Sequence, residues 1–291
     1  MDNISEKKKI GLVLEGGGMR GMYTAGVLDA FMLFGIETDG VIGVSAGAIC
    51  GCSYISKQVG RTIRYNIKYA GDKRYASFES LRKTGDIFNV DFCYDELPKR
   101  LNVFDYDTFR ERSKKIPFYV TCTNLETGGA EHIRCTDLWE EMDYMRASAS
   151  MPLVSNIIER DGLKLLDGGT ADSIPIKFFE SIGYEKNIVV LTRPDGYEKK
   201  QDPTIKLMKR MYKAYPNYVR ACEERYKIYN EQVAYIEEQE KAGKVIIIRP
   251  SRDTKIGRME KNPDKLKFIY KLGRYDTMKK LDEIKKFVKY N

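Results

Sequence analysis

Three short segments of the chain combine glycines with side chains that could carry out acyl transfer. Residues 43–47 read G-V-S-A-G around Ser45, residues 167–169 read D-G-G from Asp167, and residues 15–21 read E-G-G-G-M-R-G. A serine hydroxyl can attack a carbonyl carbon when a nearby base takes its proton, and glycine-rich backbone can offer N–H groups to the resulting oxyanion. The sequence therefore indicates a nucleophile, a base and an anion-binding loop.

Ser45 stands between an apolar run at 39–45 and a second apolar run that begins at Ala46. A G-x-S-x-G segment between a strand and a helix predicts a tight turn that lifts the serine hydroxyl above the sheet, with Gly43 and Gly47 as the small neighbours. The same pattern also suits a serine that only caps a helix. The rest of the chain has to decide between these two interpretations.

A serine nucleophile needs a base, and the composition limits the choice. His132, the only histidine, precedes every candidate acid and lies in a segment that predicts a solvated turn leading into a strand. The usual order in α/β hydrolases is serine, acid, histidine, so we expect His132 to have no catalytic role. Asp167 ends an apolar strand, where α/β sheets bind their ligands. The D-G-G segment would also suit an ordinary turn.

The first glycine segment has an alternative interpretation as a dinucleotide-binding loop. Gly16, Gly18 and Gly21 fit the G-x-G-x-x-G fingerprint that follows a strand in Rossmann folds. That fold requires an acid at the end of its second strand, whereas Glu37 and Asp39 precede the second strand here. A different oxyanion is therefore the better ligand for the loop.

The elements that must position these residues alternate between strand-like and helix-like patterns, which predicts an α/β fold with a mostly parallel sheet covered on both faces. Residues 60–115 indicate irregular helix and loop. Residues 203–241 are helical with a break near Pro216, and residues 265–290 predict two helices hinged at Gly273. We expect strands at 9–15, 39–45, 117–125, 164–168, 187–194 and 244–250, and helices at 24–35 and 46–58.

The segments GGGMRG, GVSAG and DGG, in this order, resemble those of the patatin-like phospholipase family, in particular its bacterial branch. Residues 123–129, TNLETGG, and 146–152, RASASMP, are similar as well, so that the resemblance covers about the first two-thirds of the chain. It implies a three-layer α/β/α hydrolase domain, assigned to residues 1–255 with a helical crossover at 203–241. Residues 256–291 are expected to form a helical extension packed on the same domain.

The resemblance also implies a serine acyl hydrolase with a Ser-Asp dyad, which cleaves lipid esters of the phospholipase or lysophospholipase type through an acyl-enzyme. Ser45 would be the nucleophile and Asp167 the base. A catalytically inactive, lipid-binding relative is the alternative, and a Rossmann-type dinucleotide binder is a more distant one. The expected oxyanion hole comprises Gly16, Gly17, Gly18 and Arg20, and the motif-supporting residues are Gly21, Gly43, Gly47, Gly168 and Gly169.

Composition restricts the compartment and the cofactors. The segment before the first glycines has only five consecutive apolar residues, too few for a signal peptide, and no later run reaches membrane-spanning length. The six cysteines include no C-x-x-C pair. We therefore expect a cytoplasmic protein with reduced thiols, no metal site, no cofactor and no nucleic-acid partner.

Charge is distributed unevenly along the chain. Residues 196–291 hold 25 Lys and Arg against 14 Asp and Glu, a net charge of +11, whereas residues 1–195 carry a net charge of −3. We hypothesise peripheral contact with an anionic membrane, at its inner surface, through this basic third. Ile205, Met208, Tyr212 and Tyr215 recur at helical spacing and suit either an interfacial helix or, more commonly, a helix that covers the sheet. Acyl length, head group and oligomeric state are left open.

Overall fold

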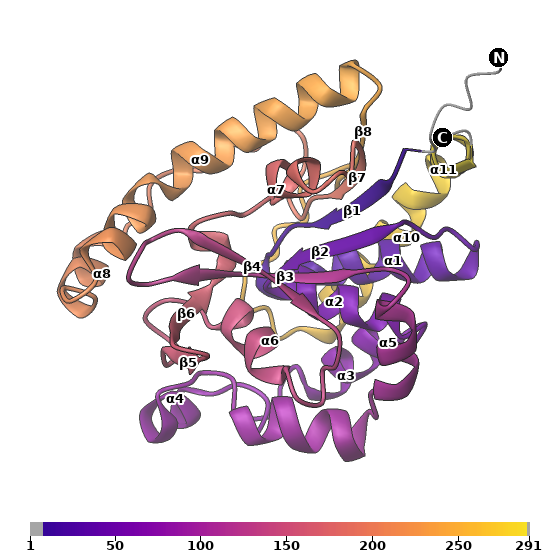
Figure 1. Cartoon of the computed structure of the whole chain (residues 1–291). Helices are drawn as coiled ribbons and strands as arrows, with labels where there is room; N and C mark the ends of the chain where they lie inside the picture. Colours follow the sequence, from indigo (N-terminus) through magenta and orange to yellow (C-terminus); the bar gives the residue numbers. More distant parts are fainter. Residues whose placement is uncertain (1–7, 290–291) are drawn as a thin grey trace.

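The structure is a computed structural model that describes residues 8–289. Within this range the chain forms one eight-stranded sheet flanked by helices (Figure 1). Five strands run parallel in the order β3-β2-β1-β7-β8, and the other three are antiparallel to their neighbours. The strands are β1 Ile10–Leu14, β2 Gly40–Val44, β3 Phe118–Asn124, β4 Ala130–Cys135, β5 Ile158–Arg160, β6 Leu163–Asp167, β7 Lys186–Val190 and β8 Val245–Ile248.

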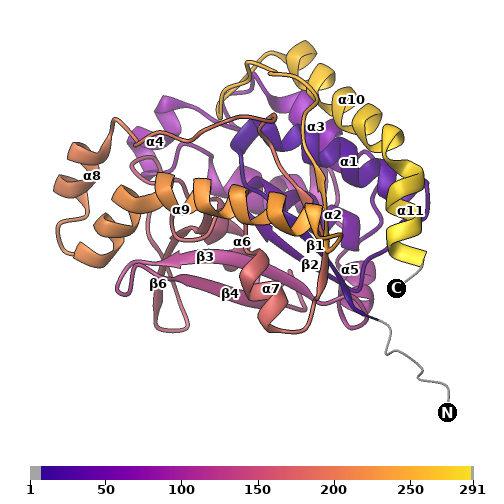
Figure 2. The ribbon, with the colours of Figure 1, turned by 90° about the horizontal axis from the view of Figure 1, so that it is seen from above.

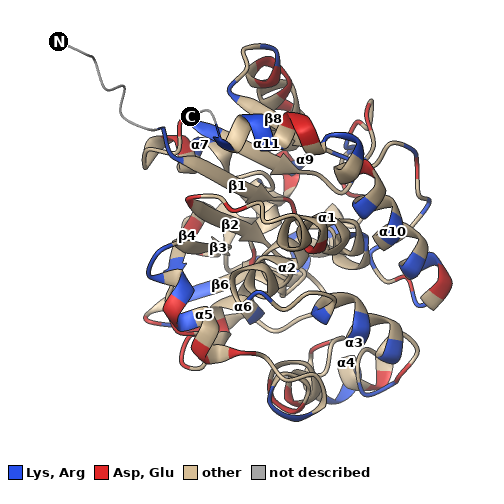
Figure 3. Ribbon diagram, turned by 90° about the vertical axis from the view of Figure 1, so that its right-hand side faces the viewer, with Lys and Arg blue, Asp and Glu red and all other residues tan. Residues whose placement is uncertain are grey.

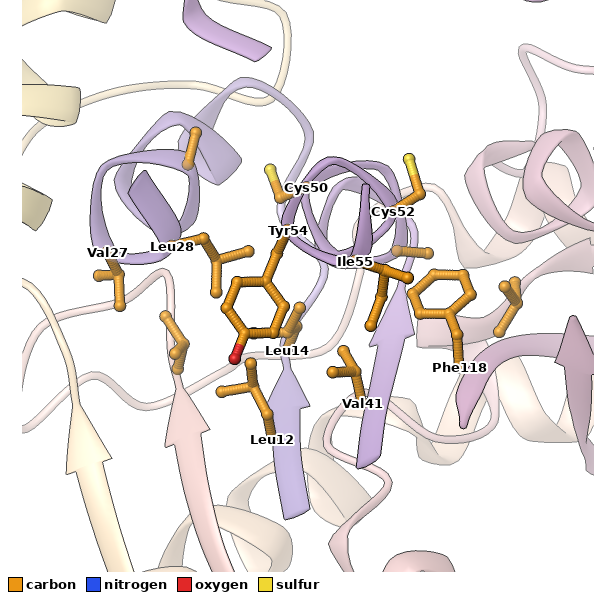
Figure 4. Close-up of a cluster of buried hydrophobic side chains, with 14 of the residues drawn as sticks. Leu12, Leu14, Val27, Leu28, Val41, Cys50, Cys52, Tyr54, Ile55 and Phe118 are labelled. Atoms are coloured by element: carbon orange, nitrogen blue, oxygen red, sulfur yellow. The ribbon is translucent and has the colours of Figure 1, made fainter. Parts of the chain in front are cut away.

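The central strands are apolar along their whole length because both faces of the sheet are covered. All five residues of β1 are buried: Leu12 and Leu14 join the core on one face, and Val13 joins the core on the other. On the first face, the helices α1 Met22–Leu33 and α2 Ala46–Ile55 pack against these strands. Val27, Leu28, Tyr54 and Ile55 from the two helices face the side chains of β1 and β2 (Figure 4).

The opposite face is covered by α7 Ile176–Ser181 and α9 Pro216–Lys241, the long helix that crosses above the sheet in Figure 2. Phe179 from α7, and Tyr229 and Ile236 from α9, are buried together with Val13 and other strand residues. Helices therefore lie on both sides of one sheet. This arrangement confirms the predicted three-layer α/β/α fold.

The remaining helices extend the first face and the carboxyl ends of the strands. They are α3 Arg61–Tyr69, α4 Phe78–Thr84, a π-helix at Asp91–Leu101, α5 Tyr106–Ser113, α6 Met142–Ala149, α8 Ile205–Met211, α10 Pro263–Lys279 and α11 Leu281–Lys289. Among them, α3, the π-helix and α6 contribute side chains to a pocket that Ser45 also lines, and α10 packs beside α1 (Figure 2).

The register of β3 explains how β6 reaches the end of β2. Thr121 of β3 is paired with Val44 of β2 on one edge, and the next residue, Cys122, is paired with Asp167 of β6. On its other edge β3 pairs with β4 at both of these positions. Strands β2 and β6 therefore share one edge of β3 and meet end to end. As a result, Asp167 lies where β2 would have continued beyond Val44.

All six predicted strands are present, and the crossover between β7 and β8 is helical with a break before Pro216, which is the first residue of α9. Strand β5 was not predicted. The expected turn leading into a strand is present, but the turn lies at residues 125–127 and His132 itself lies within β4, where six residues of β3 pair with the strand. The apolar stripe of α8 is buried, since Ile205, Met208 and Tyr212 pack into the core.

The predicted hinge at Gly273 is wrong, because α10 runs unbroken through this residue and the chain bends after Lys279. Gly273 instead permits close packing of α10 on α1. A Cβ atom there would lie 2.2 Å from the Tyr23 carbonyl oxygen, and one on Gly26 would lie 2.1 Å from the Tyr270 carbonyl oxygen. The Tyr23 hydroxyl also donates a hydrogen bond of 3.1 Å to Asp276.

The domain division after residue 255 stays a prediction.

Charged residues lie on the outer helices and loops, and the strands at the centre carry few of them (Figure 3). Both kinds of charge are scattered over the outer segments of the ribbon in this view, with Lys and Arg along α10 and α3. None of the helices that the structure describes combines the length and apolar character needed to cross a bilayer.

Candidate active site

Ser45 occupies the turn between β2 and α2, with φ 54° and ψ −123°. An L-residue rarely adopts this conformation, which costs about 1–3 kcal/mol and is typical of a nucleophile elbow. The Ser45 N–H donates a hydrogen bond of 2.8 Å to Ser148 Oγ, and the Ser148 hydroxyl donates one of 2.7 Å to the Thr121 carbonyl oxygen. Helix α6 and strand β3 thus hold the strained turn in place.

Glycines pack against this turn where a side chain would not fit. A Cβ atom on Gly43 would lie 2.5 Å from Ala48 Cα, and one on Gly47 would lie 2.4 Å from the Leu14 carbonyl oxygen. Helix α2 can therefore start directly at the ends of β1 and β2. Other motif glycines make similar close approaches: Gly16 to Ser45, Gly17 to Thr192, Gly21 to Ala46, Gly168 to Thr121 and Gly169 to Asp167.

Asp167 lies at the end of β6 and lines the same cavity as Ser45. Its residue surface is 8% exposed, and its Oδ1 accepts a hydrogen bond of 2.8 Å from the Gly169 N–H. This bond fixes one carboxylate oxygen. A carboxylate that lines the same cavity as a serine hydroxyl is a group of the kind that can accept the hydroxyl proton.

The glycine-rich loop after β1, residues 16–20, forms the floor of this cavity. The Met19 N–H donates to the Arg258 carbonyl oxygen at 3.0 Å, and the Arg20 N–H donates to the Gly17 carbonyl oxygen at 3.3 Å. Within residues 8–289, the N–H groups of Gly16, Gly17 and Gly18 donate to no protein acceptor. These three amides are consequently the donors that remain for an anionic ligand.

Arg20 is buried beside the loop, with 6% of its surface exposed. Burial, assisted by repulsion from Arg193, lowers the pKa of the Arg20 guanidinium to about 10. Its Nε has no hydrogen-bond partner among the described residues. Glu15, an acid that interacts electrostatically with Arg20, accepts hydrogen bonds from the backbone N–H and the hydroxyl of Thr192 at 2.6 and 3.0 Å. The Arg20 charge is therefore only partly compensated by the protein.

An apolar pocket begins at Ser45 and extends under α2 toward α3, the π-helix and α6. Its walls are mainly apolar and aromatic, and they contain few charged groups. A pocket of this character can hold a hydrocarbon chain with its end at the Ser45 hydroxyl. Side chains that line it include Met22, Ile49, Tyr65, Leu97, Met142 and Met145.

On its polar side, the Ser45 cavity continues into a second, basic cavity. Both cavities are lined by Arg20, Lys199, Arg225 and Arg258 together with Glu15, and Arg193 lines the outer cavity. Sequence reasoning missed Arg193, Lys199, Arg225 and Arg258. They come from separate segments around β7, α9 and the loop before α10, and no spacing in the sequence marks them.

His132 lines neither the apolar pocket nor the two polar cavities. Its Nε2 lies 3.0 Å from Asp172 Oδ2, and its ring stacks on Phe178 with 4.1 Å between the ring centroids. The imidazole is locally bonded on the outer part of the sheet. We therefore find nothing that brings it to Ser45.

Family comparison gives two matches on the chain. The model of the family described as patatin-like phospholipase matches residues 12–179, and a domain of unknown function (DUF6363) matches residues 215–289. The first match spans β1 to α7 and includes Ser45 and Asp167. The second covers α9 with Arg225, β8, the loop before α10 with Arg258, and the two C-terminal helices.

Similar curated proteins include the uncharacterized protein YjjU of Escherichia coli K12, 28% identical over 190 residues, or 64% of this chain and 52% of YjjU. Lysophospholipase nte1 of Emericella nidulans is 30% identical over 185 residues, 60% of this chain and 11% of that protein. Neuropathy target esterase sws of Drosophila melanogaster is 31% identical over 182 residues, 60% of this chain and 12% of that protein. The chain thus aligns with about half of YjjU and a small part of the other two.

Among solved structures, VipD from Legionella pneumophila superposes with a TM-score of 0.46 and 15% sequence identity. The superposition covers 95% of this chain and 67% of that chain.

Proposed function

The chain belongs to the patatin-like phospholipase family, and from this membership we propose that it is a serine acyl hydrolase acting on lipid esters. The observation that carries the proposal is the shared cavity of Ser45 and Asp167, which are 122 positions apart in the sequence and adjoin one another through β3. Ser45 also has the strained backbone of a nucleophile elbow.

In the proposed reaction, Ser45 Oγ attacks the ester carbonyl carbon while the Asp167 carboxylate accepts the hydroxyl proton. The free N–H groups of the glycine-rich loop, together with the charge of Arg20, stabilise the tetrahedral oxyanion. When the ester C–O bond breaks, the alcohol leaves with the proton from Asp167 and an acyl-enzyme remains. Water then attacks the acyl-enzyme with Asp167 again as the base, which releases the fatty acid and restores Ser45.

The apolar pocket that begins at Ser45 supports a lipid substrate over a small polar ester. Each methylene group that it buries contributes about 0.8 kcal/mol to binding. The acyl chain is then the part of the substrate that contributes most to the free energy of binding. We accordingly expect kcat/KM to rise with acyl length along a series of p-nitrophenyl esters until the chain fills the pocket.

Labelling with a fluorophosphonate probe tests the proposal directly, because the probe reacts covalently with activated serines. We expect wild-type protein to be labelled and Ser45→Ala to remain unlabelled. Ser173→Ala is the matched control, since Ser173 lines the same cavity but donates its hydroxyl to the Gly169 carbonyl oxygen at 2.8 Å. Labelling that survives in Ser45→Ala and disappears in Ser173→Ala would contradict the assignment. Folded protein that is never labelled would favour an inactive lipid-binding relative.

We further propose peripheral contact with anionic membranes. Residues 196–291 carry the net charge of +11, and α8 exposes Leu207 and Met211 next to Lys206 and Arg210. Exposed apolar and basic residues on one helix are typical of interfacial binding. Sedimentation with vesicles should give binding to anionic lipid that weakens as salt rises. Equal binding to neutral vesicles would contradict an electrostatic contact. A cytoplasmic location stays a prediction.

A further inference from the structure

A cationic side chain, Arg61, lines the apolar pocket that begins at Ser45. Among residues 8–289 it is the only charged residue of the pocket wall, which otherwise consists of apolar, aromatic and small polar residues. Arg61 is the first residue of α3, and only 5% of its surface is exposed. Arginine is rarely buried to this extent unless an anion accompanies it. The pocket therefore places a positive charge beside the path of a hydrocarbon chain.

Neutral groups hold the Arg61 side chain in place. Its Nη2 donates a hydrogen bond of 3.1 Å to the Asn102 carbonyl oxygen, and its Nη1 lies 3.5 Å from Ser53 Oγ. The guanidinium carbon lies 5.0 Å from the centroid of the Phe104 ring and 5.7 Å from that of the Tyr65 ring. These contacts orient the guanidinium group, but they do not neutralise its charge.

The charge of Arg61 lacks an acidic partner. Within residues 8–289 Arg61 forms no ion pair, whereas Arg112, which bonds to the last turn of α2, pairs with Glu37 at 2.9 Å. The Nε of Arg61 is buried and has no hydrogen-bond acceptor in the same part of the chain. A guanidinium carries more N–H groups than the contacts with Asn102 and Ser53 use, so donors remain for a ligand. An anion that reaches Arg61 through the pocket would compensate this charge.

The position of Arg61 along α2 sets its distance from the nucleophile. Ser45 caps the N-terminus of α2, and Ser53, which Arg61 contacts, lies eight positions further along the chain in this helix. At a rise of 1.5 Å per residue, the separation along the helix is about 12 Å. Ile49 and Cys52 line the pocket over the same stretch. An extended acyl chain of roughly seven to ten carbons spans this separation, because each C–C bond of about 1.5 Å advances the chain by about 1.3 Å.

We propose that Arg61 binds a carboxylate at the distal end of the acyl chain, so that the enzyme prefers half esters of dicarboxylic acids to fatty-acid esters of the same length. This inference rests on the proposed hydrolase function and specifies the acyl group. A guanidinium and a carboxylate can form paired, charge-assisted hydrogen bonds, which offset the loss of water around both charges. Water and the half ester give the dicarboxylate, the alcohol and a proton, and the distal carboxylate itself is unchanged.

Two p-nitrophenyl esters that differ only at the end of the acyl chain test this preference. Mono-p-nitrophenyl azelate ends in a carboxylate and p-nitrophenyl nonanoate ends in a methyl group, on acyl chains of equal length. With both esters dilute enough to stay monomeric, we expect the wild-type kcat/KM to be about tenfold higher for the azelate ester. Mono-p-nitrophenyl succinate should show no such preference over p-nitrophenyl butanoate, because its carboxylate is too close to the ester to reach Arg61.

The variant Arg61→Met removes the charge and keeps an unbranched side chain. It should lower the azelate-to-nonanoate ratio of kcat/KM at least about tenfold, chiefly through a higher KM for the azelate ester. The matched control is Arg64→Met, which removes the same charge from an exposed position of α3 that does not line the pocket. The control should retain the wild-type ratio.

Two outcomes with these variants would refute the carboxylate site. If Arg61→Met lowered kcat/KM equally for both esters, Arg61 would only support the fold. If Arg61→Met and Arg64→Met changed the ratio equally, general electrostatic attraction would account for the preference. Should Arg61→Met not fold, the wild-type chain-length comparison decides, because an equal preference for the succinate and azelate esters would overturn the assignment to Arg61.

Calorimetry on Ser45→Ala separates this inference from the hydrolase proposal, because it needs no turnover. Monomethyl azelate should bind, and adding Arg61→Met should weaken its binding at least about tenfold, whereas adding Arg64→Met should not. Binding that depends on Arg61 without any wild-type hydrolysis would keep the carboxylate site and reject the hydrolase. Hydrolysis with equal kcat/KM for the azelate and nonanoate esters, and no binding that depends on Arg61, would overturn the inference and keep the hydrolase.

Discussion

Gly43→Ala provides a direct test of how the elbow is built. The added Cβ would lie 2.5 Å from both Cα and N of Ala48, whereas ordinary contacts of this kind are 3.4–4 Å. These atoms are backbone, so the first turn of α2 has to move by roughly 1 Å relative to β2. We expect the folded protein to lose about 2 kcal/mol: overpacking costs about 3 kcal/mol, and restriction of the unfolded chain offsets up to about 1 kcal/mol.

The same displacement moves Ser45, which lies between Gly43 and Ala48 in the turn. A misplacement of about 1 Å at a reacting group costs about a hundredfold in rate, so kcat/KM for ester hydrolysis should fall by that order. Urea unfolding followed by circular dichroism measures the stability loss. Hydrolysis of a p-nitrophenyl ester, measured far below the unfolding transition, measures the loss of activity.

Gly71→Ala is the control, because a Cβ there would have no atom within 4 Å and the residue does not have a positive φ. This variant should be as stable as the wild type or slightly more stable, by up to about 1 kcal/mol. If Gly43→Ala were as stable and as active as Gly71→Ala, the close packing of α2 on β2 would not be what positions Ser45, and the reasoning would be refuted.

Three further outcomes follow from the site. Asp167→Asn should reduce hydrolysis to near background, and combining it with Ser45→Ala should add nothing, since members of one catalytic unit act non-additively; appreciable activity in Asp167→Asn would place the base elsewhere. His132→Gln should keep activity within about twofold in steady-state assays, because its ring bonds to Asp172 away from the cavity. A loss as large as that of Ser45→Ala would require an imidazole mechanism. Burial and repulsion from Arg193 lower the pKa of Arg20 from its ordinary value to about 10, so its charge opposes folding at any pH below 10, and this cost shrinks as the pH rises above 10. Arg20→Met should therefore unfold at higher urea concentration than wild type at pH 8 while losing activity, and a lower unfolding midpoint would contradict that cost.

The local chemistry of the chain made much of the site predictable. Residues 39–55 predict a strand, a tight turn at Ser45 and a helix, because glycines lie on either side of the serine and apolar runs precede and follow it, although the same pattern left open a serine that only caps the helix. The six predicted strands and the crossover helices could also be predicted from their own segments, because each segment has a short apolar pattern. The hinge at Gly273 failed because sequence alone does not distinguish a glycine that bends a helix from one that lets two helices touch.

Only the tertiary structure decided what surrounds Ser45. Asp167 reaches the end of β2 because β6 pairs antiparallel with β3 along the same edge, and pairing between distant strands has no signature in local periodicity. The carbonyl oxygen of Arg258, far along the chain, accepts a hydrogen bond from the Met19 N–H, whereas the N–H groups of Gly16, Gly17 and Gly18 have no acceptor among residues 8–289. The basic cavity likewise assembles from four separate segments, each ordinary in sequence. The sequence determined the candidate groups and their local turns, whereas long-range packing determined which of them meet.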